Sequence, residues 1–191
     1  MIAGLVLAGG AARRFGGPKQ LADLDGVPLL QHAVDAMLAV PALDRVVVVL
    51  GAAGEQIGAA VRFASAEPIL CEGWAEGMAA SLRAGVEELA DADWVVVTLG
   101  DMPGVTPEAI EAIIAAIETE PAADAVRAAY EGRPGHPVAL SRALLAHVGE
   151  LRGDVGAREL LRDAKVRDVE TGHLARPDDV DTPEELEAIR A

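Results

Sequence analysis

Apolar residues follow two alternating patterns along this chain. Short unbroken runs that lead into glycine predict buried strands of a parallel sheet at residues 2–7, 46–50 and 94–99. Apolar residues spaced every three or four positions predict helices at residues 28–40, 54–62 and 77–90. A further helix begins with Thr106 as N-cap and Pro107 in the first turn, and extends to about residue 118.

The second half of the chain continues the alternation with shorter elements. Strands are predicted at residues 68–71, 124–130, 137–140 and 165–169, with a turn at 132–135. Short helices are predicted at residues 141–147 and 155–163. Thr182 and Glu185 form a capping box that opens a terminal helix.

Alternation of strand and helix predicts a Rossmann-like three-layer α/β fold, in which helices cover both faces of a mostly parallel sheet. The late strands around Gly132 are expected to add a small antiparallel part. Neither a linker nor an internal repeat interrupts the pattern, so residues 1–191 are expected to form a single domain.

The charge balance narrows the range of partners. The chain has 16 basic and 31 acidic residues and a net charge of −15, which argues against binding to nucleic acid or to an anionic membrane. With Cys71 as the single cysteine, an internal disulfide and a cysteine-rich zinc site are excluded. No apolar run has the length of a membrane span, so a cytoplasmic protein is expected.

The loop after the first strand collects positive charge in this acidic chain. Gly9 and Gly10 allow close approach of the backbone to a ligand, and Arg13, Arg14 and Lys19 follow. This combination predicts a triphosphate cradle; the alternative is a glycine turn with solvated arginines. Neither a Walker loop nor a G-x-G-x-x-G motif is present, which disfavours P-loop and NAD-binding folds.

Asp101 follows the apolar run 94–99 and Gly100. Ligands of open parallel sheets bind at the carboxyl ends of strands, so this carboxylate is expected in the ligand crevice. Beside phosphates it predicts a Mg²⁺ ligand, because Mg²⁺ takes one or two carboxylates together with phosphate oxygens and water. The alternative is a carboxylate that caps a turn or helix.

Six motifs together resemble the molybdenum-cofactor nucleotidylyltransferase family of the NTP-transferase superfamily, and most closely its cytidylyltransferase branch. They occur in the family's order along almost the whole chain. The motifs span residues 7–19, 76–82, 100–103, 135–138, 153–158 and 179–185.

The resemblance implies a fold of the nucleotide-diphospho-sugar transferase type and transfer of a nucleoside monophosphate to a phosphorylated acceptor, with release of pyrophosphate. It places Lys19, Arg13 and Asp101 in catalysis. The nucleotide would contact Leu7, Ala8, Gly9, Gly10, Arg13, Lys19, Gly77 and Ser81. Mg²⁺ would be held by Asp101 and Asp181.

Several residues keep two interpretations. Asp181 would bind metal, with Asp179 as substitute, or would cap the last helix. His136 would contact the acceptor or hydrogen-bond to the backbone. Asp154 and Arg158 would orient the acceptor or form a local ion pair at helical spacing.

The base and the acceptor are also left open. Cytidylyltransferases of this kind usually carry Leu-Ala-Ala-Gly, whereas residues 7–10 read Leu-Ala-Gly-Gly, as in guanylyltransferases. The missing methyl at Gly9 would leave space for guanine, while the motifs at 135–137 and 153–156 favour CTP. Molybdopterin is the expected acceptor and a molybdoenzyme the expected recipient of the product; another small phosphorylated acceptor, or a non-catalytic chaperone for a nucleotide or cofactor, is the alternative.

Overall fold

The computed structural model describes residues 1–190 and has a mixed seven-stranded sheet at its centre. The strand order is β5-β4-β1-β6-β8-β7-β9, and β8 alone runs antiparallel to its two neighbours. The strands are β1 (Ile2–Ala8), β4 (Arg45–Leu50), β5 (Glu67–Leu70), β6 (Trp94–Leu99), β7 (Ala125–Tyr130), β8 (Arg133–Ser141) and β9 (Val166–Glu170). A separate two-stranded ribbon joins β2 (Asp23–Leu24) to β3 (Val27–Pro28).

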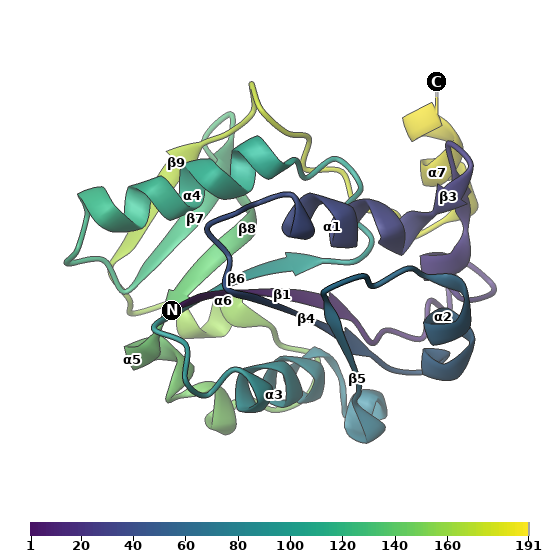
Figure 1. The fold of residues 1–191 in the computed structure, drawn as a ribbon, viewed down its shortest axis with the longest axis horizontal. Helices are drawn as coiled ribbons and strands as arrows, with labels where there is room; N and C mark the ends of the chain where they lie inside the picture. The colour runs from purple at the N-terminus through teal and green to yellow at the C-terminus, as the bar shows by residue number, and fades with distance from the viewer. Residues whose placement is uncertain (191) are drawn as a thin grey trace.

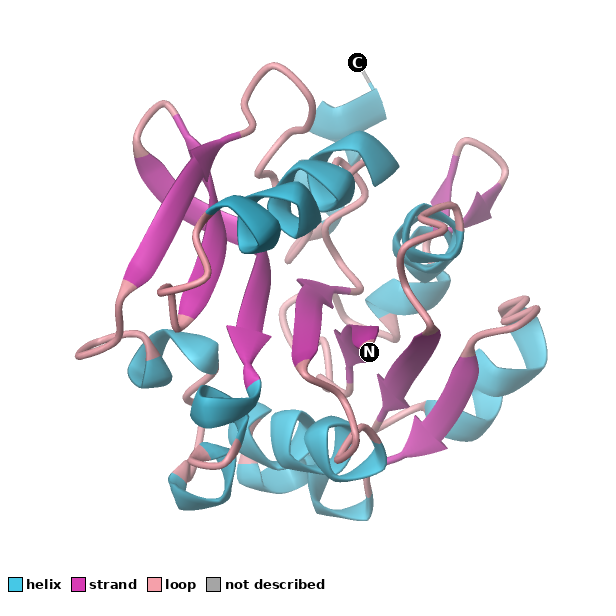
Figure 2. Ribbon diagram, turned by 60° about the vertical axis from the view of Figure 1, so that its left-hand side comes forward, coloured by secondary structure: helices cyan, strands magenta, loops and turns pink. Residues whose placement is uncertain are grey.

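Helices cover both faces of this sheet (Figures 1 and 2). One face carries α1 and α4, and the other carries α3, α5 and α6 (Figure 1). The helices are α1 (Leu29–Leu38), α2 (Gly54–Ala60), α3 (Met78–Glu88), α4 (Pro107–Thr119), α5 (Arg142–Leu145), α6 (Ala157–Leu160) and α7 (Pro183–Arg190). Three short 3₁₀ helices are η1 (Lys19–Leu21), η2 (Glu72–Glu76) and η3 (Val148–Glu150).

Strand β1 shows why the central strands are apolar throughout. Leu5 packs into the core under α3, and the next residue, Val6, packs into the core under α1 and α4. Because successive side chains point to opposite faces, a strand that is covered on both faces needs apolar residues at every position. The predicted Rossmann-like α/β architecture is therefore confirmed.

The hairpin between β7 and β8 differs from the prediction. The turn is the two-residue pair Glu131 and Gly132, whose φ angles of 52° and 75° suit the tight turn of a twisted hairpin. Gly135, expected in the turn, lies in β8, where a Cβ would be 2.7 Å from the ring of Tyr130. The turn prediction at 132–135 was wrong because Gly135 is needed for packing against an aromatic ring.

Most other predicted elements are present, with shorter ends. The helix predicted at 155–163 is restricted to α6, and the one at 141–147 to α5. Among residues 1–190, none of the helices has the length and apolar character that crossing a membrane would require.

Candidate functional site

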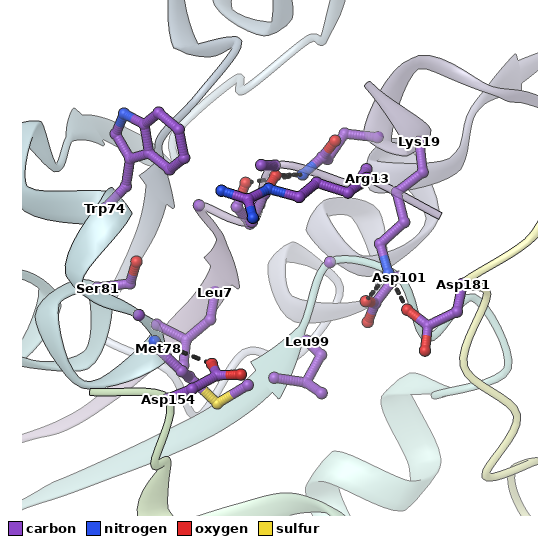
Figure 3. Close-up of a pocket in the computed structure, with 18 of the residues that line it drawn as sticks. Leu7, Arg13, Lys19, Trp74, Met78, Ser81, Leu99, Asp101, Asp154 and Asp181 are labelled. Atoms are coloured by element: carbon purple, nitrogen blue, oxygen red, sulfur yellow. Dashed lines mark hydrogen bonds and ion pairs between the residues drawn. The ribbon is translucent and has the colours of Figure 1, made fainter. Parts of the chain in front are cut away.

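A cavity of about 630 Å³ lies at the carboxyl ends of β1 and β6 (Figure 3). Strand β1 has β4 on one side and β6 on the other, so the chain changes direction across the sheet at this point. Open α/β sheets bind ligands at such switch points. The first cavity, as we call it, is lined by the loop after β1, by η2 and the start of α3, and by residues 99–101, Asp154, Asp179 and Asp181.

The loop after β1 is held in place by Gln20. This side chain is 3% exposed, and its Nε2 donates hydrogen bonds to the carbonyl oxygens of Ala8 (3.0 Å) and Gly10 (3.2 Å). Both carbonyls are thereby satisfied within the protein, which limits their repulsion of an anionic ligand. Gln20 was not predicted from the sequence, because nothing in the local sequence separates this buried glutamine from a surface one.

Three cationic side chains near this loop differ in burial and in their ion pairs. Lys19 is 7% exposed, and its Nζ lies 2.6 Å from Oδ2 of Asp101 and 2.7 Å from Oδ1 of Asp181. Arg14 is largely exposed and pairs with the other oxygen of Asp181. Arg13 extends into the first cavity and makes no ion pair or side-chain hydrogen bond with residues 1–190, which leaves its guanidinium available to a ligand (Figure 3).

The titration of these groups follows from burial and pairing. Burial raises the pKa of Asp101 and outweighs the opposing effect of Lys19. The hydrogen bond from Lys19 lowers the pKa of Asp181, which is closer to solvent. Burial disfavours the charged form of Lys19, but its two carboxylate partners outweigh burial and raise its pKa. Lys19 therefore carries its positive charge at neutral pH.

Asp101 and Asp181 are suited to a divalent cation. Oδ1 of Asp101 is buried and has no hydrogen-bond partner, so one ligand position remains free. No group of three or more His, Cys, Asp or Glu side chains within residues 1–190 forms a metal site by itself. Two carboxylates completed by phosphate oxygens and water are the environment that Mg²⁺ accepts.

Asp181 faces the cavity and does not cap α7. Its carboxylate contacts Lys19 and Arg14, whereas the helix is capped by the predicted box: Glu185 N donates to Thr182 Oγ1 (3.3 Å), and Thr182 N donates to Glu185 Oε2 (2.9 Å). The neighbouring Val180 N donates to the carbonyl oxygen of Asp101 (2.9 Å). That bond holds the two carboxylate segments together, although 80 positions separate them in the sequence.

The opposite end of the first cavity contains Trp74 and Ser81 (Figure 3), and Gly77 also lines the cavity. Gly77 has a φ of 112°, and a Cβ there would lie 2.5 Å from the backbone of Gly153, so glycine is required on both counts. A Cβ on Gly9 would lie 2.5 Å from Oγ of Ser81. The Ser81 hydroxyl therefore lies where a methyl group at position 9 would be, while the choice between CTP and GTP stays a prediction.

Asp154 connects the first cavity to a second hollow. Its Oδ1 accepts a long hydrogen bond from Met78 N (3.4 Å), and the carbonyl oxygen of Gly153 accepts one from Ala79 N (3.1 Å). These contacts satisfy free N–H groups at the start of α3. The local ion pair considered between Asp154 and Arg158 is absent from residues 1–190.

The second hollow has a volume of about 550 Å³ and contains Arg127, Arg158 and Arg162 along with Asp154. Arg127 pairs with Asp168 (2.8 Å) and Arg162 pairs with Glu159. Arg158 is exposed and has no such partner among the described residues. It is therefore the guanidinium in this hollow that is available to bind an anion.

His136 lies apart from both hollows, on β8. Its ring is partly buried, and burial lowers its pKa to about 4, so it is neutral at pH 7. Its carbonyl oxygen accepts a hydrogen bond from the Tyr130 hydroxyl (2.7 Å). Contact between His136 and an acceptor stays a prediction, and the proposal below does not use it.

Residues 4–170 match the family described as the MobA-like NTP transferase domain. The chain belongs to this family. It is thus an enzyme of the nucleotidyltransferase kind, and the predicted superfamily is confirmed.

Relatives in this family carry different names. The chain is 30% identical to the purine catabolism protein PucB of Bacillus subtilis, over 98% of this chain and 95% of PucB. It is 28% identical to the nicotine blue oxidoreductase of Paenarthrobacter nicotinovorans, over 97% of this chain and 94% of that protein. A probable molybdenum cofactor guanylyltransferase of Bacillus cytotoxicus is 32% identical over 69% of this chain and 64% of its own length.

Solved structures share the fold over nearly the full length. The crystal structure of Rv0371c from Mycobacterium tuberculosis H37Rv superposes with a TM-score of 0.87 at 30% identity, covering 98% of this chain and 96% of that one. A second structure of Rv0371c, in complex with manganese, has a TM-score of 0.82 at 27% identity and covers 98% and 97% of the two chains.

Proposed function

We propose that this protein transfers a nucleoside monophosphate from a nucleoside triphosphate to the phosphate of a small acceptor and releases pyrophosphate. CTP and molybdopterin are the proposed substrates. The observation that carries this proposal is the position of Lys19, held between Asp101 and Asp181 beside a loop of small residues. That arrangement offers a buried positive charge and two carboxylates to a polyphosphate.

Asp101 and Asp181 would hold a divalent cation, which we propose is Mg²⁺. When bound, the ion would neutralise charge on the phosphates and favour departure of pyrophosphate. The manganese complex of Rv0371c supports divalent-metal binding in a relative of this fold.

The chain's own residues would bind and orient both anions. Arg13 and Lys19 would hold the triphosphate, and the backbone of residues 7–10 would border the ribose and base. An oxygen of the acceptor phosphate would attack the α-phosphorus, while the bond from that phosphorus to the bridging oxygen breaks and pyrophosphate leaves with the electron pair. A phosphate monoester is largely ionised at neutral pH, so no side chain needs to act as a general base.

The acceptor would enter from the side of Asp154. Within residues 1–190, Arg158 is the cation of the second hollow that has no ion-pair partner, and Asp154 borders both hollows. An acceptor with anionic groups is therefore favoured there. Molybdopterin has a terminal phosphate and fits the reaction, and a molybdoenzyme would receive the product.

The filled space beside Gly9 favours CTP over GTP. The larger guanine base would use free volume next to Gly9, and Oγ of Ser81 occupies that volume. The motifs at residues 135–137 and 153–156 favour the same base.

Pyrophosphate release tests the proposal. The purified protein is incubated with each of the four ribonucleoside triphosphates, with Mg²⁺, Mn²⁺ or a chelator, and with molybdopterin or other small phosphorylated metabolites. We expect metal-dependent release that is largest with CTP and molybdopterin. Nucleotide binding without release under any condition would instead support a non-catalytic nucleotide-binding protein.

A further inference from the structure

The two ends of the first cavity differ in chemistry. Lys19, Asp101 and Asp181 form a charged end, while the other end presents the indole of Trp74 near the hydroxyl of Ser81 (Figure 3). A nucleoside triphosphate has the same polarity, with a flat aromatic base at one end and a polyphosphate at the other. The charged end accounts for the phosphates, so the indole is left as a candidate partner for the base.

Trp74 is unusual among the aromatic residues of this chain. The chain has five of them, two Trp, one Tyr and two Phe, and within residues 1–190 only Trp74 lines the first cavity. The other four pack in or against hydrophobic clusters, as Trp74 does, but do not line the first cavity: Phe15, Phe63, Trp94 and Tyr130. An aromatic side chain at this cavity is therefore not a consequence of an aromatic-rich composition.

The backbone of Trp74 is held by hydrogen bonds of η2. Trp74 N donates to the carbonyl oxygen of Cys71 (3.2 Å), and Gly77 N donates to the carbonyl oxygen of Trp74 (3.1 Å). The side chain packs partly against the core under α3 and remains partly exposed. Covering such a partly exposed aromatic surface with a flat ring removes it from water, and this favours binding.

We propose that Trp74 is the residue on which the base of the nucleoside triphosphate stacks. The inference rests on the proposed function, because it requires a nucleotide in the first cavity. Every base has a π-face, so stacking adds affinity for all four nucleotides and does not choose among them. Base choice then depends on the edge of the base, which Ser81 and the backbone of residues 7–10 border.

Fluorescence provides the first test. The second tryptophan, Trp94, begins β6 and lies outside the first cavity, so the substitution Trp94→Phe leaves Trp74 as the only tryptophan. Titration of this variant with CTP or GTP should quench the emission of Trp74, whereas inorganic tripolyphosphate, which has no base, should leave it nearly unchanged. Equal quenching by tripolyphosphate would overturn the inference.

Binding calorimetry provides the second test. Trp74→Ala should weaken binding of each nucleoside triphosphate about fivefold to a hundredfold, and binding of tripolyphosphate should not change. Trp74→Phe should restore most of the lost affinity, because a ring is again available for stacking. Unchanged nucleotide affinity in Trp74→Ala would overturn the assignment of Trp74.

The two proposals fail in different ways. If the wild-type protein binds nucleotides and releases pyrophosphate but Trp74→Ala does the same with equal affinity, the stacking assignment is wrong and the proposed function stands. If the wild-type protein binds no nucleoside triphosphate, the proposed function is wrong and the stacking assignment is wrong with it.

Discussion

The first cavity and the second hollow place their charged residues in opposite environments. In the first cavity the Lys19 ammonium is almost fully buried between two carboxylates, whereas in the second hollow Arg158 and Arg162 are exposed. Charges in a water-poor cavity interact strongly and hold a fixed geometry, while solvated arginines are screened and mobile. The proposed nucleotide end of the site would thus have a fixed geometry, and the proposed acceptor end would adapt to different anions.

Removing the carboxylate at the buried end should have the largest effect. Asp101→Asn keeps the shape of the side chain but removes the charge that a divalent cation requires. We expect turnover to fall about a thousandfold or more, with little change in melting temperature. Asp178→Asn is the control, because Asp178 is an exposed carboxylate that does not line the first cavity. Similar rates in Asp101→Asn and the wild-type protein would contradict the metal assignment.

Comparing two cations of the loop would show whether burial is the deciding factor. Lys19→Ala should lower kcat/KM for the nucleotide about a hundredfold, because it removes a buried positive charge from the phosphate end. Arg14→Ala removes a cation whose side chain is 71% exposed, and it should change kcat/KM only a few-fold. Steady-state kinetics of both variants, with their folding checked by circular dichroism, measures the contrast. Equal losses of kcat/KM in the two variants would show that burial of the cation is not the deciding factor.

His136 on β8 should make the free energy of unfolding depend on pH. Burial lowers the pKa of His136 to about 4, whereas an unfolded histidine titrates near 6.5. Between these values the unfolded chain binds a proton that the folded protein does not, so the free energy of unfolding should fall as the pH drops from 6.5 to 4. The loss should be at most about 3 kcal/mol.

Urea denaturation at pH 7 and at pH 4.5 measures this dependence. The His136→Gln variant cannot titrate at this position and should lose less stability between the two pH values than the wild-type protein. An equal loss in both proteins would show that other groups cause the pH dependence.

A smaller effect than that of Lys19→Ala is expected in the exposed second hollow. Arg158→Ala should raise the KM of the acceptor about tenfold and leave the KM of the nucleotide unchanged, because it removes one charge-assisted contact in an open hollow. Arg167→Ala is the control, since Arg167 is exposed on β9 and lies outside the second hollow. A change in nucleotide KM for Arg158→Ala would mean that the two regions do not act separately.

The local sequence predicted most of the fold and part of the site. The apolar runs and helical spacings located β1, β4, β6, α1 and α3, because burial on two faces or on one face imposes its own period on the chain. The glycines and cations of residues 9–19 and the carboxylate of Asp101 were visible for a similar reason, since both lie where an apolar strand stops. Resemblance to a family was needed to connect Asp181 with them.

Tertiary structure decided which of these residues meet. The pairing of Lys19 with Asp101 and Asp181, the support of the loop by Gln20 and the placement of Trp74 at the cavity each join segments that are distant in sequence or that carry no local pattern. The same is true of Ser81 beside Gly9 and of Tyr130 against Gly135. Periodicity in the sequence indicates only whether a residue is buried. A site depends on which side chains from different elements share the buried space, and the packing of those elements determines which side chains these are.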